Sequence, residues 1–120
     1  DISTPGKWHT VKGLSGGNIQ KVLLGREIEL HPQLLITAYP VRGLDIGASY
    51  NIYDTLNAQK EQGVAILFIG EDLDVLLALC DRIMVIHAGA VMDIVDAKTA
   101  SKEEIGMLML GHRPGEEAAV

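Results

Sequence analysis

Short apolar runs that alternate with helix-like segments constrain the fold of this chain more than any other feature. Runs of strand length, bounded by turn-forming residues, occur at 34–37, 64–69, 82–87 and 91–95. The last two flank the short turn Ala88-Gly89-Ala90, which predicts a hairpin. Strands that alternate with helices are typical of an α/β domain with a mostly parallel sheet. We expect the strands at 34–37 and 64–69 to be buried.

Capping residues and helix breakers mark the ends of the predicted helices. The first two helices are predicted from Ser15 to about Leu30 and from Ala48 to Gln62. Asp72 is expected to cap a third helix. Ser101 and Glu104 form a capping box at the start of a fourth. Proline disfavours helical geometry in the residue before it, so His31-Pro32 ends the first helix. Cys80 lies in an apolar helical run and is expected in the core. The tail, residues 112–120, is expected to be disordered.

Composition excludes several classes of function. The net charge of −6 argues against a nucleic-acid partner, and the single cysteine, Cys80, excludes an internal disulfide. The histidines His9, His31, His87 and His112 lack metal-ligand spacing, so we expect no metal site built from them. We see no signal peptide and no apolar run near the ~20 residues of a membrane span. The sequence therefore predicts a cytoplasmic chain.

The stretch Leu14-Ser15-Gly16-Gly17-Asn18-Ile19-Gln20-Lys21 places a capping serine and two glycines at the start of a helix. Each glycine destabilises a helix by ~1 kcal/mol relative to alanine, so something is expected to approach the backbone closely there. The amides of a helix N-terminus attract an anion, most often phosphate. A capped helix with a flexible start explains the same residues, and spacing alone does not decide between the two.

The stretch 14–21 resembles the signature motif of ABC transporter ATPase domains, in the form that sugar and nucleoside importers use. The resemblance continues over about Ile2 to Gly111. It implies that residues 1–111 form part of a P-loop NTPase (RecA-like) domain, with a mostly parallel sheet and flanking helices. In this family the signature closes over the γ-phosphate of ATP held by the opposite ATPase domain. By resemblance, the residues that contact nucleotide in trans are Ser15, Gly16, Gly17 and Gln20.

The same resemblance indicates that catalytic residues of the family are replaced in this chain. A family strand ends in Asp-Glu-Pro-Thr, where the Asp orders Mg²⁺ and the Glu polarises the attacking water. Ala38 and Tyr39 stand at those positions, and neither offers a carboxylate. Glu71 stands at the position of the switch histidine, and an ionised carboxylate cannot donate a hydrogen bond to phosphate. This half-site is therefore expected not to hydrolyse ATP efficiently.

Two further groups of residues allow more than one interpretation. Gly43-Leu44-Asp45 resembles the D-loop, which crosses the dimer interface of the family, but it also fits a glycine turn in which Asp45 caps the next helix. Glu71 and Asp72 could form the paired carboxylates of a small acidic hydrolase. Acidic residues at a helix start, where the dipole favours negative charge, are the simpler interpretation of that pair.

The Walker A loop, the adenine-stacking aromatic and the glutamine loop of the family are not found in this sequence. The resemblance therefore implies a C-terminal fragment of a longer ATPase, as in the degenerate second half of a tandem one. ATP and Mg²⁺ are expected in the intact parent and neither in the isolated fragment. The expected partners of the parent are a second ATPase domain, transmembrane permease subunits and an extracytoplasmic solute-binding protein, at the cytoplasmic face of the membrane.

The missing Walker A strand also has a structural consequence. In the family it lies between the strands at 64–69 and 82–87, so the fragment is expected to have a gap in its sheet. Unpaired strand edges favour rearrangement, strand swapping or self-association. The alternative function is a non-catalytic interaction or regulatory α/β module with no nucleotide role.

Overall fold

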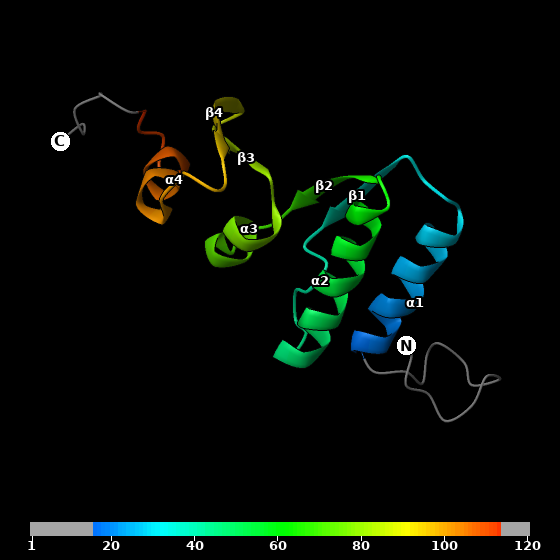
Figure 1. Cartoon of the computed structure of the whole chain (residues 1–120). Helices are drawn as coiled ribbons and strands as arrows, with labels where there is room; N and C mark the ends of the chain where they lie inside the picture. The colour runs from blue at the N-terminus through cyan, green and yellow to red at the C-terminus, as the bar shows by residue number, and fades with distance from the viewer. Residues whose placement is uncertain (1–15, 114–120) are drawn as a thin grey trace. The chain divides into compact units, whose positions relative to one another are not determined.

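The structure is a computed structural model that describes residues 16–113 (Figure 1). Its elements are, in chain order, α1 (Gly16–Glu29), β1 (Leu34–Ala38), α2 (Ile46–Glu61), β2 (Ala65–Ile69), α3 (Leu73–Leu79), β3 (Arg82–His87), β4 (Ala90–Asp96) and α4 (Lys102–Met109). The chain divides into two compact units, and the division falls between Ile69 and Gly70. No helix within the described range is both long enough and apolar enough to cross a membrane.

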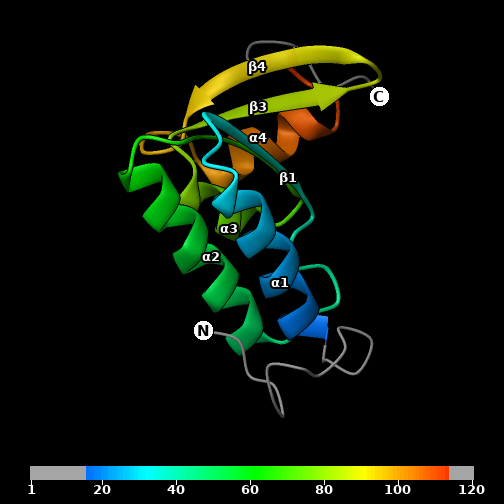
Figure 2. The same ribbon diagram turned by 90° about the vertical axis from the view of Figure 1, so that its right-hand side faces the viewer.

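The first unit is built on the parallel pair of β1 and β2, in which Leu35 is the partner of Ile66. Helices α1 and α2 lie side by side (Figure 2). Ile52 and Leu56 are four residues apart on α2, so they share one helix face. Together with Leu35 they form the buried core of the unit, and Leu24 of α1 packs against it. Helix α2, predicted over Ala48 to Gln62, thus provides two of the three buried residues of this core.

Only one face of the β1–β2 sheet is covered. The side chains of Leu34, Ile36, Leu67 and Ile69 are 55%, 60%, 43% and 40% exposed, respectively. The register pairs Leu34 with Ala65 and Ile36 with Leu67, so these side chains share the face opposite Leu35. The prediction of two buried strands is wrong, because within the first unit the helices α1 and α2 cover one face of the sheet alone. We call this apolar, exposed surface the bare face; its members are Leu34, Ile36, Leu67 and Ile69.

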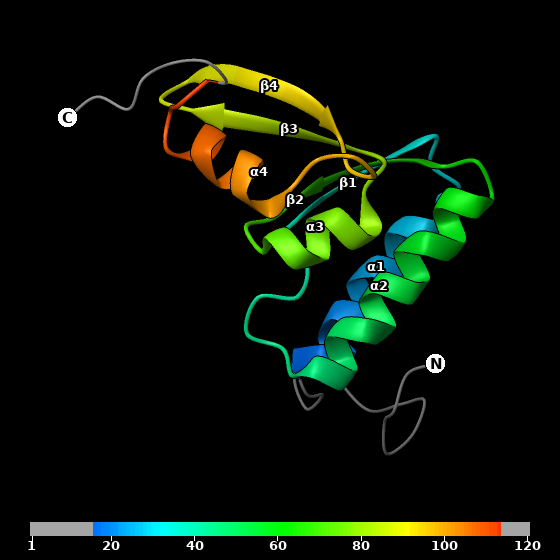
Figure 3. The same ribbon diagram turned by 60° about the vertical axis from the view of Figure 1, so that its left-hand side comes forward.

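The second unit is a hairpin that packs on α4, and α3 packs against α4. β3 pairs with β4 in antiparallel orientation, and His87 is the partner of Ala90. The two-residue loop between them, Ala88 and Gly89, has φ angles of +50° and +79°, as a type I′ turn requires. Figure 3 shows α4 beneath the hairpin and α3 next to α4. The buried residues of this unit are Leu76, Ile83, Val85, Ala97, Ile105 and Leu108.

The helix starts of the second unit follow the predicted caps. The Asp72 carboxylate accepts hydrogen bonds from the amides of Asp74 and Val75, at 3.1 and 3.4 Å. The Ser101 hydroxyl accepts one from the amide of Glu104, at 3.1 Å. Cys80 is the C-cap of α3 and only half-buried, so its expected place in the core is wrong.

The start of the predicted tail is partly described. The amide of His112 donates to the carbonyl of Met107, at 3.0 Å, so the chain folds back over the end of α4 as far as this residue. The rest of the segment expected to be disordered, residues 114–120, lies outside the described residues.

The strands belong to two separate two-stranded sheets, β1–β2 and β3–β4. β2 and β3 are therefore not hydrogen-bonded neighbours. The expected gap between the strands at 64–69 and 82–87 stays a prediction, as does its compensation by rearrangement or self-association.

Candidate functional site

The predicted signature falls at the start of α1. Ser15 lies outside the described residues, and Gly16 and Gly17 are the first two residues of the helix. The first amides of an α-helix have no intrahelical partner, and the helix dipole favours an anion there. The first turn of α1 contains no acidic residue that would repel an anion. The backbone at Gly16 and Gly17 is thus suited to a close approach by a phosphate.

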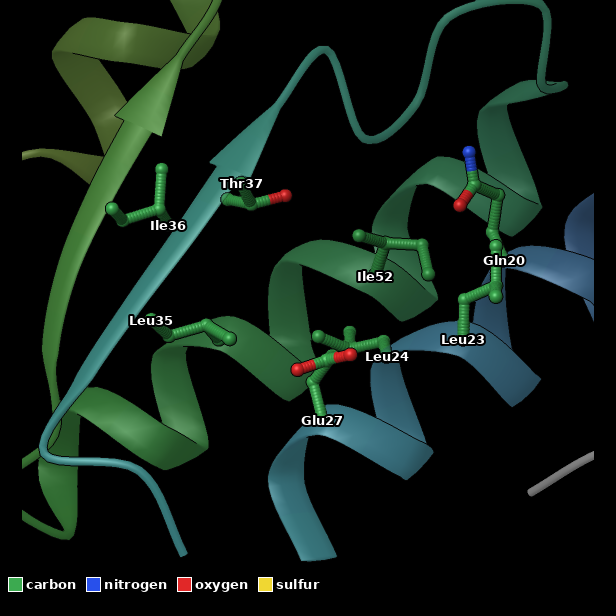
Figure 4. A pocket seen from close by; sticks show the side chains of 8 residues that line it. All are labelled: Gln20, Leu23, Leu24, Glu27, Leu35, Ile36, Thr37 and Ile52. Atoms are coloured by element: carbon green, nitrogen blue, oxygen red, sulfur yellow. The ribbon is translucent and has the colours of Figure 1, made fainter. Parts of the chain in front are cut away.

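Gln20, the fourth predicted contact, lies one turn farther along α1 than Gly16 and Gly17. Its half-buried side chain lines a hollow of about 120 Å³ between α1, α2 and β1 (Figure 4). The other lining residues are Leu23, Leu24, Glu27, Leu35, Ile36, Thr37 and Ile52. Pockets for drug-sized ligands measure roughly 300–1,000 Å³, so this hollow is too small for a nucleotide. It is a gap in the packing of the first unit rather than a ligand site.

The carboxyl ends of β1 and β2 meet at one edge of their sheet, where ligands bind in α/β folds. The amide of Tyr39, just after β1, donates to the carbonyl of Ile69 at the end of β2, at 2.8 Å. Tyr39 has a φ of +49°, a left-handed conformation that is unusual for a bulky residue. Backbone strain of this kind clusters at functional sites. Ala38 and Tyr39 are therefore at the position where ligands bind in an α/β fold.

Arg42 holds the Tyr39 side chain in place. Its guanidinium carbon lies over the Tyr39 ring, 4.0 Å from the centroid. The amide of Arg42 also donates to the Tyr39 carbonyl, at 3.2 Å, which closes the turn between them. A cation–π contact at an exposed site stabilises by roughly 0.5–1 kcal/mol. The contact between Tyr39 and Arg42 was not predicted from the sequence. The sequence shows only an aromatic residue three positions before an arginine, in a segment that contains proline and glycine.

The residues at the end of β1 do not fit a magnesium site. Mg²⁺ requires oxygen ligands in near-octahedral geometry, and carboxylates are its usual protein ligands. Ala38 offers a methyl group, and the ring of Tyr39 lies under a guanidinium. The Asp45 carboxylate is turned to the amide of Ala48, at 2.8 Å. Across residues 16–113, no three His, Cys, Asp or Glu side chains come together as metal ligands would.

The segment Gly43-Leu44-Asp45 connects this turn to α2. Gly43 has a φ of +78°, which favours glycine, and the half-buried Leu44 packs against the core of Leu35, Ile52 and Leu56. Asp45 is the N-cap of α2, as the alternative interpretation predicted. A capping role does not exclude a D-loop role, since the turn before the cap is still exposed at Arg42 and Gly43. The D-loop role stays a prediction.

Glu71 and Asp72 follow Gly70 at the start of the second unit. Asp72 uses its carboxylate to cap α3, and Glu71, the residue before it, is exposed. The structure therefore supports the helix-start interpretation of this pair over the paired-carboxylate hydrolase. The role of Glu71 at the switch-histidine position stays a prediction.

Comparison with known proteins relates the chain to ATP-binding subunits of importers. It is 44% identical over 111 residues to the nucleoside import ATP-binding protein NupA of Lactococcus lactis subsp. cremoris, covering 92% of this chain and 22% of that protein. It is 40% identical over 111 residues to the guanosine import ATP-binding protein NupO of Bacillus subtilis, with the same coverage. Against the ribose import ATP-binding protein RbsA of Bacillus cereus, the identity is 44% over 101 residues, or 84% of this chain and 20% of that protein. No family model matches the chain.

Solved structures lead to the same family. An ATP-binding cassette of an ABC transporter in its ADP conformation superimposes with a TM-score of 0.65 and 26% identity, covering 82% of this chain and 37% of that one. The cassette cbiO1 from Clostridium perfringens, part of the ABC transporter complex cbiONQ, gives 0.66 and 27%, covering 83% and 39%. The chain spans about a fifth of the length of the curated relatives it matches. In sequence and in fold, the chain is similar to part of the ABC transporter ATP-binding proteins of the sugar and nucleoside import type.

Proposed function

We propose that this chain is part of the ATP-binding subunit of an ABC importer and supplies the signature motif to an ATP site on a partner ATPase domain. The observation that carries the proposal is the start of α1. Two glycines form its first residues, directly after Ser15, in a chain 44% identical to a nucleoside import ATP-binding protein. The γ-phosphate of ATP on the partner would contact the Ser15 hydroxyl and the amides of Gly16 and Gly17.

The half-site of this chain itself does not hydrolyse ATP in this proposal. A general base must accept a proton from water, and a carboxylate does this at neutral pH far better than a phenol. Tyr39 stands where the family has the catalytic glutamate, and its ring is covered on one face by Arg42. The intact protein would thus combine one ATP site that hydrolyses ATP, completed by this signature, with a second site that does not hydrolyse ATP.

The partners follow from the same proposal. They are a second ATPase domain, transmembrane permease subunits and an extracytoplasmic solute-binding protein, with the subunit at the cytoplasmic face of the membrane. The transported solute is a nucleoside or a sugar such as ribose, by likeness to the relatives named for those solutes. ATP and Mg²⁺ act in the parent, and the isolated chain binds neither.

Uptake by the whole transporter tests the proposal. The full-length subunit, assembled with its permease in proteoliposomes that enclose ATP, is expected to accumulate radiolabelled guanosine or ribose when its solute-binding protein is supplied. Ser15→Arg should abolish uptake, because the larger charged side chain blocks the approach of the partner's γ-phosphate. Ser101→Arg is the matched control, since it removes a cap from a helix start outside the signature. Equal loss in both variants, or no uptake of either solute by wild type, would count against the proposal.

The bare face favours a second candidate function, a protein-interaction module without a nucleotide role. Contiguous exposed apolar surface marks interaction sites. The two functions differ in one measurable property: an interaction module would leave ATP hydrolysis by the parent unchanged when Ser15 is replaced.

A further inference from the structure

The strand β1 has a free edge among the described residues. Within residues 16–113, its only hydrogen-bonded neighbour in the sheet is β2. The carbonyl of Gln33 and the amide of Tyr39, just before and just after β1, bond to residues of β2 at 3.0 and 2.8 Å. Successive residues of a strand direct their backbone groups to opposite sides, so Leu35 and Thr37 face β2 as well. The residues that direct their amides and carbonyls away from β2 are Leu34, Ile36 and Ala38.

The helix layer of the first unit is wider than its sheet. α2 packs on both strands, because Ile52 and Leu35 of β1 belong to one buried cluster, against which Ile66 of β2 packs. α1 lies next to α2 on the side of β1, as Figure 4 shows. Packed helices lie about 8–10 Å apart, whereas neighbouring strands lie about 4.8 Å apart. α1 therefore extends past the free edge of β1, beneath the place of one further strand.

The hollow described above lies where α1 extends past β1. It is lined from β1 by Leu35, Ile36 and Thr37, and from α1 by Gln20, Leu23, Leu24 and Glu27. An apolar cavity of roughly 150 Å³ takes up a molecule of benzene. The hollow of about 120 Å³ thus has room for one aliphatic side chain, and the carboxylate of Glu27 disfavours an acidic one.

We propose that the free edge of β1 takes up one further strand, an extended segment of the parent subunit that is apolar on both faces. On the helix side, one aliphatic side chain of this segment fills the hollow. On the opposite side, its side chains continue the bare face, where Leu34 and Ile36 are 55% and 60% exposed. In strand addition of this kind, backbone hydrogen bonds supply affinity and pockets for alternate side chains supply specificity.

The free edge follows from the structure, while the place of the added strand in the parent rests on the proposed function. The match to NupA covers 22% of that protein, so most of this relative lies outside the matched segment. A second copy of the chain does not fit the same edge. A copy that paired its own β1 symmetrically would bring its α1 into the space that α1 already occupies, because both helices extend past the shared edge.

Hydrogen–deuterium exchange of the full-length subunit tests the proposal, with mass spectrometry that resolves single amides. The amides of Ile36 and Ala38 should exchange as slowly as those of Leu35 and Thr37, which face β2. At a free edge, the outward amides would instead exchange faster by about a hundredfold or more, because an amide without a hydrogen bond exchanges without any opening of the structure.

Proline at an outward position gives a matched pair of variants. Ile36→Pro removes an outward amide without removing a hydrogen bond to β2, and its ring occupies the space of the added strand. The amide of Ala38 should therefore exchange at least about tenfold faster in Ile36→Pro than in wild type. Ile36→Ala controls for the lost side chain and should match wild type. Slow exchange of Thr37 in both variants would show that β1 and β2 remain paired.

Filling the hollow gives the same information if Ile36→Pro does not fold. Leu23→Phe places a larger side chain in the hollow and should speed exchange of Ile36 and Ala38. Leu30→Phe is the control, because Leu30 is 71% exposed and does not line the hollow. Unchanged exchange in Leu23→Phe and slow exchange of Ala38 in a folded Ile36→Pro would each overturn the proposal.

Two results in the wild-type subunit would also overturn it. One is fast exchange of Ile36 and Ala38 beside slow exchange of Leu35 and Thr37. The other is protection that appears only as the protein concentration rises, which would assign the edge to a second copy. Neither result involves the signature, so the proposed function would stand. Uptake that is insensitive to Ser15→Arg would overturn the proposed function and leave this edge unaffected.

Discussion

The Asp45 carboxylate accepts a hydrogen bond from the amide of Ala48, at 2.8 Å, and so fixes the first turn of α2. The carbonyl of Asp45 also accepts a hydrogen bond from the Ser49 hydroxyl, at 2.8 Å. This residue ends the turn that begins at Tyr39, and α2 carries Ile52 and Leu56 of the buried core. The cap therefore connects the candidate site to the packing of the first unit.

Replacing Asp45 tests this connection. Asp45→Ala should lower the free energy of unfolding by about 1 kcal/mol, since it leaves the amide of Ala48 without its side-chain acceptor. Asp45→Asn should retain most of the stability because asparagine is also a good N-cap. Urea denaturation followed by circular dichroism measures the change. Asp54→Ala, at an exposed position within α2, is the control, and an equal loss in that variant would show that the cap is not the cause.

Two glycines near the end of the chain should respond to alanine in opposite ways. Gly111 has a φ of +88°, and a Cβ there would lie 2.8 Å from Nε2 of His87. Gly111→Ala should therefore destabilise the chain by about 1–2 kcal/mol. Gly106 lies inside α4, and a Cβ added there would meet no neighbouring atom within 4 Å. Gly106→Ala should therefore stabilise the chain by about 0.5–1 kcal/mol.

A double variant separates the two causes at Gly111. Because His87→Ala removes both the ring that the new methyl group would meet and the contact of this ring with the Met109 carbonyl, Gly111→Ala should destabilise the His87→Ala variant less than it destabilises wild type. The loss of stability that Gly111→Ala still causes in the His87→Ala variant measures the strain of an alanine at a positive φ. Thermal unfolding of the set measures both, and an equal effect of Gly111→Ala in the two backgrounds would mean that His87 does not contact this turn.

Replacing two isoleucines of α2 by alanine should change the free energy of unfolding by very different amounts, although both lie on one helix. Ile52 is 2% exposed and Ile46 is 76% exposed. Ile52→Ala should lower the free energy of unfolding by about 2–5 kcal/mol, because it removes methyl groups from a packed core. Ile46→Ala should change it by no more than about 0.5 kcal/mol. Similar values for the two variants in urea denaturation would contradict the packing of α2 described above.

The bare face predicts self-association of the isolated chain. Its apolar side chains are exposed, and the β1–β2 sheet has unpaired edges within the described residues. Sedimentation velocity should find dimers or larger species, and Ile36→Glu with Leu67→Glu should shift them toward monomer. Ile46→Glu introduces a charge away from this face and should not. A wild-type chain that stays monomeric at micromolar concentration would contradict the prediction.

Much of the fold could be predicted because its signals are local. Asp72 and Ser101 cap helices where expected, and the strand at 82–87 has the predicted bounds. Burial was less predictable. Leu34 and Ile36 form an apolar run with Leu35, but only Leu35 is buried, because the covering helices lie on one side. An apolar run does not indicate how many of its faces the rest of a protein covers.

The candidate site was predictable only in part. The resemblance indicated Ala38 and Tyr39 as the positions of a replaced motif, which stays a prediction; in the structure Ala38 ends β1 and Tyr39 follows it. The stacking of Arg42 on Tyr39 and the positive φ of Tyr39 depend on how the turn closes, which no residue spacing specifies. The contact of His87 Nδ1 with the Met109 carbonyl, at 3.0 Å, was likewise missed, since the two residues are 22 positions apart.

The decisive measurement is ATP hydrolysis by the assembled transporter, with Ser15→Arg compared to Tyr39→Phe in the full-length subunit. Ser15→Arg should reduce hydrolysis to background, because in the proposed function the signature completes the working site on the partner domain. Tyr39→Phe should leave the rate unchanged, because this half-site has no base to lose. Full activity in Ser15→Arg, or a collapse in Tyr39→Phe, would contradict the proposed function.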